Sequence, residues 1–462
     1  MKKLSLLIFV ITTLTAAAQV PFPPTPSFET SPQDHYGTGL GIADINGDGW
    51  KDIIVANGND IQRQRLVVYY NRGDGTFPLL PDWQSADVDY HGHLSAGDID
   101  NDGDVDIAVS VYLGPGGFGD RGKVKVYYNS GTALESTPSF IAQDFYSFSC
   151  ALGDADGDGD LDLAVACAEP YGSIYDHGRI FFNIDGVFSP TPGWQSDVQM
   201  GAMDVEFGDI DQNGFLDLMF VCQNTDNYVF LADNNGFIDE THDWQSDNTQ
   251  NFMNSLAFGK VHFTAPPCMA VTGNDQLGGD GRVKQYTFTP PIPSSSGPSW
   301  ESGYVGYGSG ILMAEINNDG YNDLLYGSWW GPLVILEGCC DFWNTAPVYT
   351  SDATSVVEAI LMSDLGKFNY QPGTHTAKII AESGVITLEQ QVIERINNVY
   401  VNGVPLNRSD YAYAELRNWV SFRDHLMPGD LVSIEYDYML NGDIVISNWD
   451  PIKGNYIYYN DN

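Results

Sequence analysis

The sequence predicts an all-β fold, a seven-bladed β-propeller with a small β-sandwich-like insertion in the seventh blade. A glycine-rich acidic phrase recurs seven times, with its first positions 49 to 56 residues apart. The 49 Gly and 24 Pro residues favour short strands and turns over long helices. The two ends of the chain also resemble complementary parts of one repeat, which favours a closed ring of sheets.

Residues 1–18 are expected to be a secretory signal peptide. Lys2 and Lys3 precede an apolar run too short to span a bilayer, and the alanines at 16–18 resemble a cleavage site. A membrane anchor is the alternative, but three prolines between positions 21 and 24 would break its helix. We therefore expect an exported protein, secreted, periplasmic or at the cell surface, with no transmembrane segment after signal removal.

The charge balance narrows the classes of partner. Acidic residues outnumber basic ones by 61 to 20, which gives a formal net charge of −41. This excludes a nucleic-acid binder with a basic face, because phosphate binding requires clustered Lys and Arg. The composition favours cations as partners. The 43% hydrophobic content is enough to fill a large core, so the charge does not indicate disorder.

Residues 19–369 are assigned to blades one to six and the start of blade seven. In each unit an acidic loop precedes an aliphatic strand, a polar loop and a further strand, such as LVVYYN from Leu66. A solenoid would have the same periodicity. We prefer a ring because Pro24–Ser31 resembles a fourth strand and YIYYND from Tyr456 a third, so their pairing removes a free sheet edge. The first loop positions are Asp44, Asp98, Asp154, Asp209, Lys260, Glu315 and Asp364.

The seventh unit is interrupted. Its acidic loop opens at Asp364, but the strand that should follow begins only near Asp443. The residues between them read as β-hairpins, so residues 370–440 are assigned to an inserted β-domain. Residues 441–462 are expected to complete blade seven by closing onto the N-terminal strand. Insertion in a loop is tolerated when the flanking strands remain paired.

Five loops are candidate metal sites, because oxygen-bearing residues recur at positions 1, 3, 5 and 9, with glycine at position 6 and a backbone carbonyl at position 7. Only a cation makes so many carboxylates at close range tolerable. The expected ligands are Asp44, Asn46, Asp48, Trp50 and Asp52; Asp98, Asp100, Asp102, Asp104 and Asp106; Asp154, Asp156, Asp158, Asp160 and Asp162; Asp209, Asp211, Asn213, Phe215 and Asp217; and Glu315, Asn317, Asp319, Tyr321 and Asp323.

The donor set favours Ca²⁺, at about five sites. Zinc prefers nitrogen and sulfur ligands, and Mg²⁺ requires a strict octahedron. An EF-hand would carry Glu at position 12, where these loops carry strand residues such as Val55. Acidic turns without metal are the alternative, but five such loops at one period favour a common function.

At these residues the sequence resembles the FG-GAP and VCBS repeats of integrin-α-like seven-bladed propellers. The resemblance implies that each loop joins the first two strands of a blade on one face, and that ligands approach the opposite face. Two units depart from the pattern. Lys260 occupies the first position in unit five, where its ammonium group could replace the ion, and unit seven is split between Asp364 and Asp443. Neither unit is assigned a metal.

Two further motifs have competing interpretations. The tripeptide from Arg72 to Asp74 spells RGD, but it lies where the repeat has a hairpin turn, and the turn is preferred. Cys150 and Cys167 are expected to face each other across antiparallel strands, either as a disulfide or as reduced core thiols.

Two functions follow. The favoured one is a non-catalytic binding or adhesion scaffold for extracellular polysaccharide or protein, in which aromatic residues such as Trp329, Trp330 and Trp449 could contact the ligand or simply pack between blades. The alternative is a secreted carbohydrate-active enzyme of the polysaccharide lyase type. Its candidate general bases are His91, His93, Tyr175 and His177. The favoured scaffold function is non-catalytic, so no catalytic residue is assigned for it.

Overall fold

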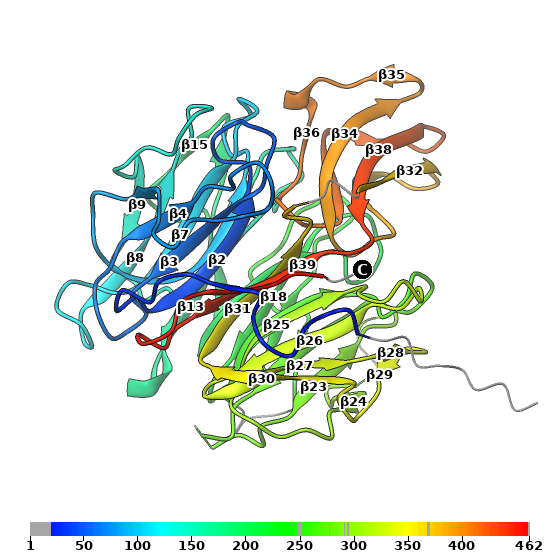
Figure 1. Cartoon of the computed structure of the whole chain (residues 1–462). Helices are drawn as coiled ribbons and strands as arrows, with labels where there is room; N and C mark the ends of the chain where they lie inside the picture. The colour runs from blue at the N-terminus through cyan, green and yellow to red at the C-terminus, as the bar shows by residue number, and fades with distance from the viewer. Residues whose placement is uncertain are drawn as a thin grey trace, which may run out of the picture.

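The computed structural model describes residues 20–247, 252–276, 278–290, 292, 295–366 and 370–460 (Figure 1). The expected signal peptide, residues 1–18, and the boundary at residue 369 lie outside the described residues. Within them the protein is all-β, as predicted, with two short 3₁₀ helices, η1 (Pro170–Gly172) and η2 (Arg408–Asp410). No helix in the described part is long and apolar enough to cross a membrane.

Three antiparallel sheets form in chain order from the N-terminal half. The first contains β2 (Gly37–Ala43), β3 (Asp52–Asn57), β4 (Leu66–Tyr69) and β5 (Trp83–Gln84). The second contains β6 (Tyr90–Gly97), β7 (Asp106–Leu113), β8 (Arg121–Tyr127) and β9 (Phe140–Gln143). The third contains β10 (Ser149–Gly153), β11 (Asp162–Ala166), β13 (Ile174–Phe181), β12 (Ala168–Glu169) and β16 (Trp194–Met200).

Three more sheets repeat this order. The fourth contains β17 (Ala202–Gly208), β18 (Asp217–Cys222), β19 (Tyr228–Phe230) and β20 (Trp244–Gln245). The fifth contains β21 (Met253–Gly259), β22 (Cys268–Gly273), β23 (Val283–Thr287) and β24 (Trp300–Glu301). The sixth contains β25 (Gly308–Ala314), β26 (Asp323–Ser328), β27 (Gly331–Leu336) and β30 (Tyr349–Ser355). Two small hairpins are β14 (Asn183–Ile184) with β15 (Val187–Phe188), and β28 (Gly338–Cys339) with β29 (Phe342–Trp343).

A further sheet combines the two ends of the described chain. Its order is β1 (Phe28–Glu29), β40 (Tyr456–Tyr458), β39 (Asp443–Asn448) and β31 (Val357–Ser363). Phe28 pairs with Ile457 and Glu29 with Tyr456. The N-terminal strand therefore covers the edge that β40 would otherwise expose, which protects the sheet from pairing with another chain.

The inner strands are buried on both faces because each sheet packs between two others. In β3 every residue of DIIVAN is buried, and such continuous apolar runs are typical of strands covered on both sides. Ile54 of the first sheet shares a core cluster with Ile107 of the second. Ile53 of the first sheet shares another with Val445 of the sheet that combines the chain ends.

The first strands of the sheets contact one another in a cyclic order. The contacts run β2 to β6, β6 to β10, β10 to β17, β17 to β21, β21 to β25, β25 to β31, and β31 back to β2. Consecutive sheets therefore pack side by side around a common centre.

Two sheets lie between β31 and β39 in the sequence. One contains β32 (Tyr370–Lys378), β38 (Leu431–Met439), β34 (Ile393–Val401) and β35 (Val404–Pro405), and the other contains β33 (Ser383–Thr387), β37 (Trp419–Leu426) and β36 (Tyr411–Ala412). They share a core that includes Ile386, Phe422 and Ile434. In Figure 1 the orange and red strands β32, β34 and β38 stand together beside the other sheets, while β31 still pairs with β39.

The expected pairing of Cys150 with Cys167 is wrong. The register places Cys150 opposite Val165, because pairing starts at Gly153 and Asp162 on either side of the loop. All six cysteines are free thiols, and Cys150 and Cys167 are both buried. The thiol interpretation left open by the sequence therefore describes this part of the core.

Gly92 provides a test of the close contact between neighbouring inner strands. A Cβ at this position would lie 2.0 Å from the Phe148 carbonyl oxygen, which already accepts a hydrogen bond from the His93 amide at 2.7 Å. We expect Gly92→Ala to lower the free energy of unfolding by about 1–3 kcal/mol through overpacking, measured by urea denaturation. Gly297→Ala, where the nearest atom is 3.4 Å away, is the control. Equal effects of the two changes would contradict the close contact.

Candidate metal sites

Each of the five predicted loops joins the first and second strands of a sheet and wraps around its first acidic side chain. The position-1 carboxylate accepts a hydrogen bond from the backbone N–H of the position-6 glycine, at 2.7 Å for Asp44 and Gly49 and 3.1 Å for Asp98 and Gly103. These glycines have positive φ, 90° at Gly49, which other residues rarely adopt. The same bond is made by Asp154, Asp209 and Glu315.

The position-9 aspartate joins the loop to the third strand of its own sheet. Asp106 accepts hydrogen bonds from the Ile99 amide at 2.9 Å and the Asn129 amide at 2.7 Å. The side-chain amide of Asn129 donates in turn to the Ile45 carbonyl in the loop of the preceding sheet, at 2.9 Å. Asn183 and Asn71 make the equivalent bonds to the loops that precede theirs. The loops of the first three sheets are therefore connected directly, and the loop of the first sheet is connected to that of the last.

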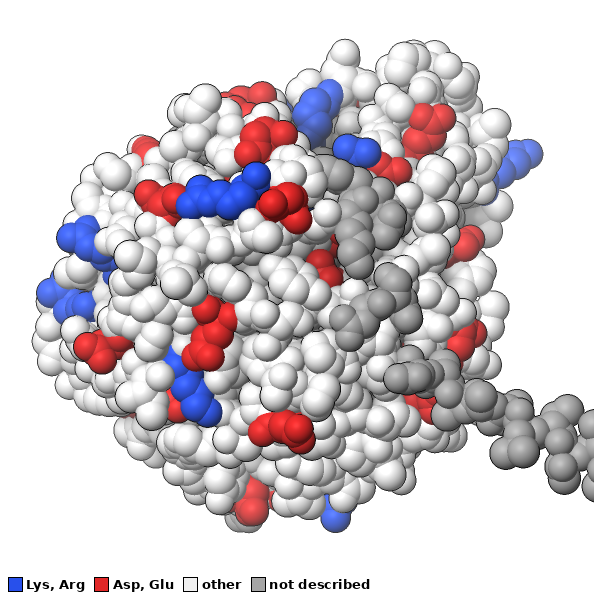
Figure 2. Space-filling view, viewed as in Figure 1, with Lys and Arg blue, Asp and Glu red and all other residues white. Residues whose placement is uncertain are grey.

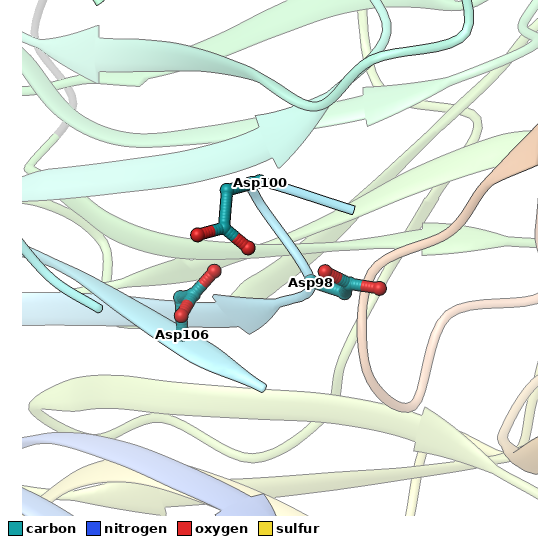
Figure 3. Close-up of side chains that lie close together, drawn as sticks. All are labelled: Asp98, Asp100 and Asp106. Carbon is teal, nitrogen blue, oxygen red and sulfur yellow. The ribbon is translucent and has the colours of Figure 1, made fainter. Parts of the chain in front are cut away.

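The structure gathers carboxylates from positions 1, 3 and 9 in three loops. In each, one oxygen per residue lies within 4.8 Å of the others. Figure 3 shows one of these groups, Asp98, Asp100 and Asp106, held between the ends of β6 and β7. The other two groups are Asp154, Asp156 and Asp162, and Asp209, Asp211 and Asp217.

In the first and sixth loops position 3 is an asparagine. Asn46 and Asn317 accept hydrogen bonds from the amides of Asp48 and Asp319, as Asp100 does from Asp102. Their carboxylates come from positions 1, 5 and 9, which are Asp44, Asp48 and Asp52 in the first loop and Glu315, Asp319 and Asp323 in the sixth. The loop fold is thus shared, although these two loops have fewer carboxylates at the centre.

Positions 5 and 7 have different roles from positions 1, 3 and 9. The position-5 side chains of Asp48, Asp102, Asp158, Asn213 and Asp319 accept hydrogen bonds from the amides of position 7, which are Trp50, Asp104, Asp160, Phe215 and Tyr321. The Asp160 side chain is buried and bonds to Arg423 and Asn101 outside its own loop. Phe215 is part of the hydrophobic core. Position 7 of these two loops therefore offers only its backbone carbonyl to a ligand.

Buried carboxylate oxygens without partners support a cation in these loops. Asp98 Oδ1, Asp156 Oδ1, Asp209 Oδ1 and Asp323 Oδ2 are buried and accept no hydrogen bond. Burial is the main cause that raises the pKa of Asp98 to about 6, against the opposing effect of Arg408, and that of Asp323 to about 8; neighbouring carboxylates contribute to both increases. Buried charge of one sign requires compensation, so these residues fit a divalent cation with oxygen ligands.

The fifth and seventh units, which were not assigned a metal, differ from the five predicted loops in the contacts of their loop residues. Lys260 donates to the Gln212 side-chain oxygen of the fourth loop at 3.1 Å, so its ammonium group turns toward the neighbouring sheet. In the seventh unit Asp443 accepts from the Leu365 amide at 3.1 Å, as a position-9 aspartate does. The Asp364 amide donates to Glu394, a fully buried residue of the inserted segment.

The segment from β32 to β38 lies against the second, third and fourth loops, a contact that sequence analysis missed. The Arg408 guanidinium is 3.1 Å from Asp98 Oδ2, and the Ser421 hydroxyl donates to Asp154. His425 Nε2 lies 2.9 Å from the Gly157 carbonyl, and the Gly384 amide donates to the Gly214 carbonyl. No periodic signal in the sequence could have located these contacts, because they join segments more than 150 residues apart.

The candidate bases of the lyase alternative are dispersed. His91 is fully buried, with Nδ1 2.8 Å from the Asn57 carbonyl and Nε2 3.0 Å from Lys125, so it cannot reach a polysaccharide. His177 bonds to the Ser196 carbonyl and Tyr175 lies in β13. His93 lines a pocket on the opposite face.

The RGD segment forms the turn that the repeat pattern predicts. Asp74 accepts hydrogen bonds from the amide and hydroxyl of Thr76. Arg72 pairs with Asp82 at 2.8 Å, so both charged groups of the motif have partners within the turn and its neighbouring strand.

The loops predict an unusual pH dependence for the metal-free protein. Burial raises the pKa of Asp52 to about 7 and that of Asp106 to about 8, against about 4 in the unfolded chain. At pH values between the unfolded-state and folded-state pKa values, the folded protein binds more protons than the unfolded one. The free energy of unfolding therefore falls as the pH rises. In EDTA we expect a lower urea midpoint at pH 8 than at pH 5.5. A urea midpoint that rises from pH 5.5 to pH 8 would contradict the raised pKa values of these loop aspartates.

Part of the chain is similar to known proteins. An FG-GAP-like repeat model matches residues 30–109. Integrin alpha-3 of Mus musculus is 32% identical over 116 residues, 23% of this chain and 10% of the integrin. Integrin alpha-7 of Homo sapiens is 31% identical over 116 residues, 23% of this chain and 9% of the integrin. The chain thus spans about a tenth of the length of these relatives.

The fold can also be compared with solved structures. BBS1N, in a crystal structure of its complex with ARL6DN soaked with lead, has a TM-score of 0.49 and 12% sequence identity. The superposition covers 89% of this chain and 98% of that chain.

Proposed function

We propose that the chain, which matches an FG-GAP-like repeat over residues 30–109 and is similar to integrin alpha chains over part of its length, is an exported, calcium-binding scaffold of the adhesion type. Its ligand is an extracellular polysaccharide or protein. The observation that carries the proposal is the set of buried, unpartnered carboxylate oxygens that recur in equivalent loops around the ring of sheets. Export rests on the sequence of residues 1–18.

The proposed architecture is a closed seven-bladed propeller with an inserted β-sandwich. The cyclic contacts of the first strands, from β2 round to β31 and back, support seven blades. The pairing of β1 with β40 supports closure by the chain ends. The separate core that contains Val420 and Val432 supports an inserted unit at residues 370–440.

Calcium is the proposed ion because every donor in the loops is oxygen. The side-chain oxygens at positions 1, 3, 5 and 9 and the carbonyl at position 7 would hold it, and its charge would compensate the carboxylates among them. The loop would then pin the first two strands of a blade to each other and, through residues such as Asn129, to the preceding blade. The ion is thus proposed to stabilise the scaffold and not to take part in a reaction.

Calcium removal tests the scaffold. For sites that bind at about 10⁻⁴–10⁻³ M, calcium at about 10 mM adds about 1.4–2.7 kcal/mol per site. We expect EGTA to lower the melting temperature substantially, and Mg²⁺ to restore less of it than Ca²⁺. Asp100→Asn, which removes a carboxylate from a central group, should reduce the calcium-dependent shift. Asp104→Asn is the matched control, because Asp104 is at position 7, where the backbone carbonyl is the expected ligand and is kept by this change. An EGTA-insensitive melt would disprove the sites.

Ligand binding tests the second half of the proposal. The purified protein should bind one class of extracellular glycan or matrix protein on an array, and binding should fall when EGTA unfolds the scaffold. Unsaturated uronate absorbance, measured with the same glycans, should not increase. Turnover without stable binding would contradict a scaffold and indicate an enzyme.

A further inference from the structure

A cavity of about 200 Å³ opens near the centre of the ring, at the end of the sheets away from the metal loops. Its lining comes from the starts of first strands and from the connections after second strands. These include Asp60 after β3, His93 in β6, Trp329 after β26, Glu358 in β31 and Trp449 after β39. We propose that this pocket binds an alkylammonium group, such as the end of a lysine side chain on an extracellular protein ligand. This rests on the proposed scaffold function and specifies its ligand.

The charges in the pocket favour a cation. Glu358 is 5% exposed, and its carboxylate accepts a hydrogen bond from Trp329 Nε1 at 2.8 Å. Asp60 lines the same cavity, and within the described residues neither acid forms an ion pair with Lys or Arg. The imidazole of His93 lies 3.6 Å from Asp204, whose carboxylate offsets its charge. Asp60 and Glu358 therefore share the pocket with His93 as the titratable base nearby, and without a Lys or Arg partner among the described residues.

The protonation behaviour of the two acids agrees with this. Burial raises the pKa of Glu358 to about 8, although His93 and the Trp329 N–H partly offset the effect. Burial also raises the pKa of Asp60. A cation that enters the pocket would lower both values and recover the cost of keeping carboxylates out of water.

Three tryptophans surround the opening. The Trp329 and Trp449 rings stack with centroids 6.4 Å apart and an interplanar angle of 23°, and Trp330 meets Trp449 edge-on at 6.5 Å. Trp330 is 54% exposed and has φ of 53°, an uncommon value for so large a residue. Indole faces attract ammonium groups, most strongly when the cation is desolvated.

Other ligand classes fit less well. An anion would be repelled by Asp60 and Glu358. A neutral sugar could stack on the tryptophans but would leave the carboxylates uncompensated. Figure 2 shows acidic and basic side chains interspersed over the face in view, with no continuous basic patch.

Tryptophan fluorescence tests the proposal on the full chain in calcium. Nα-acetyl-lysine methylamide is the probe, and its norleucine counterpart is the neutral control of the same carbon length. We expect at least about tenfold weaker binding for norleucine. Glu358→Gln, which keeps an acceptor for Trp329, and Trp330→Leu, at an exposed side chain, should each weaken lysine binding about tenfold. Glu301→Gln, on the exposed edge strand β24, should leave lysine binding unchanged.

The outcomes are separable from those for the scaffold. Equal binding of the two probes, or binding of neutral oligosaccharides alone, would overturn the ammonium site while leaving the calcium-dependent melt intact. Calcium-dependent melting measured on each variant establishes that it is folded. Lysine binding that is unchanged in both Glu358→Gln and Trp330→Leu would also overturn the proposal, since the probe would then bind elsewhere.

Discussion

The structure depends on a buried aspartate at the end of each acidic loop. Asp52, Asp106, Asp162 and Asp217 each accept backbone amides both from their own loop and from the end of the third strand, so one side chain sets the register of three strands. An asparagine beside it, such as Asn129, extends the contact to the preceding sheet. Asn71 makes this bond to Leu365, between the first and last sheets. The same local device therefore orders the first three sheets and connects them to one another and to the last sheet.

That device concentrates negative charge in places that water reaches poorly, and the chain compensates it in several ways. Lys260 approaches the fourth loop, Arg408 pairs with Asp98, and Arg423 pairs with Asp160. Carboxylate oxygens that remain without partners, such as Asp209 Oδ1, mark where compensation is incomplete. A buried carboxylate without a partner is costly, which is why these positions are the natural places for a cation.

The two faces of the ring of sheets differ. At the loop end the inserted segment places Ser421 and His425 against the third loop, so part of that surface is covered by the chain itself. At the other end the connections after the second strands leave a pocket with Glu358 beneath a group of tryptophans. The segment from β32 to β38 therefore covers part of the acidic-loop face, while the pocket lies at the opposite end of the sheets.

Periodicity was enough to determine much of this protein from its sequence. The recurrence of acidic positions 1, 3, 5 and 9 located the loops, because each repeat must satisfy the same backbone groups with the same residue types. The interruption after Asp364 likewise predicted additional strands at this point, and β32 to β38 lie in the chain between the paired strands β31 and β39. Only the tertiary structure decided the contacts between distant segments. The approach of Arg408 to Asp98, the register that separates Cys150 from Cys167, and the meeting of Asp60 with Glu358 arise from how sheets pack around a centre, and no local pattern encodes such distances.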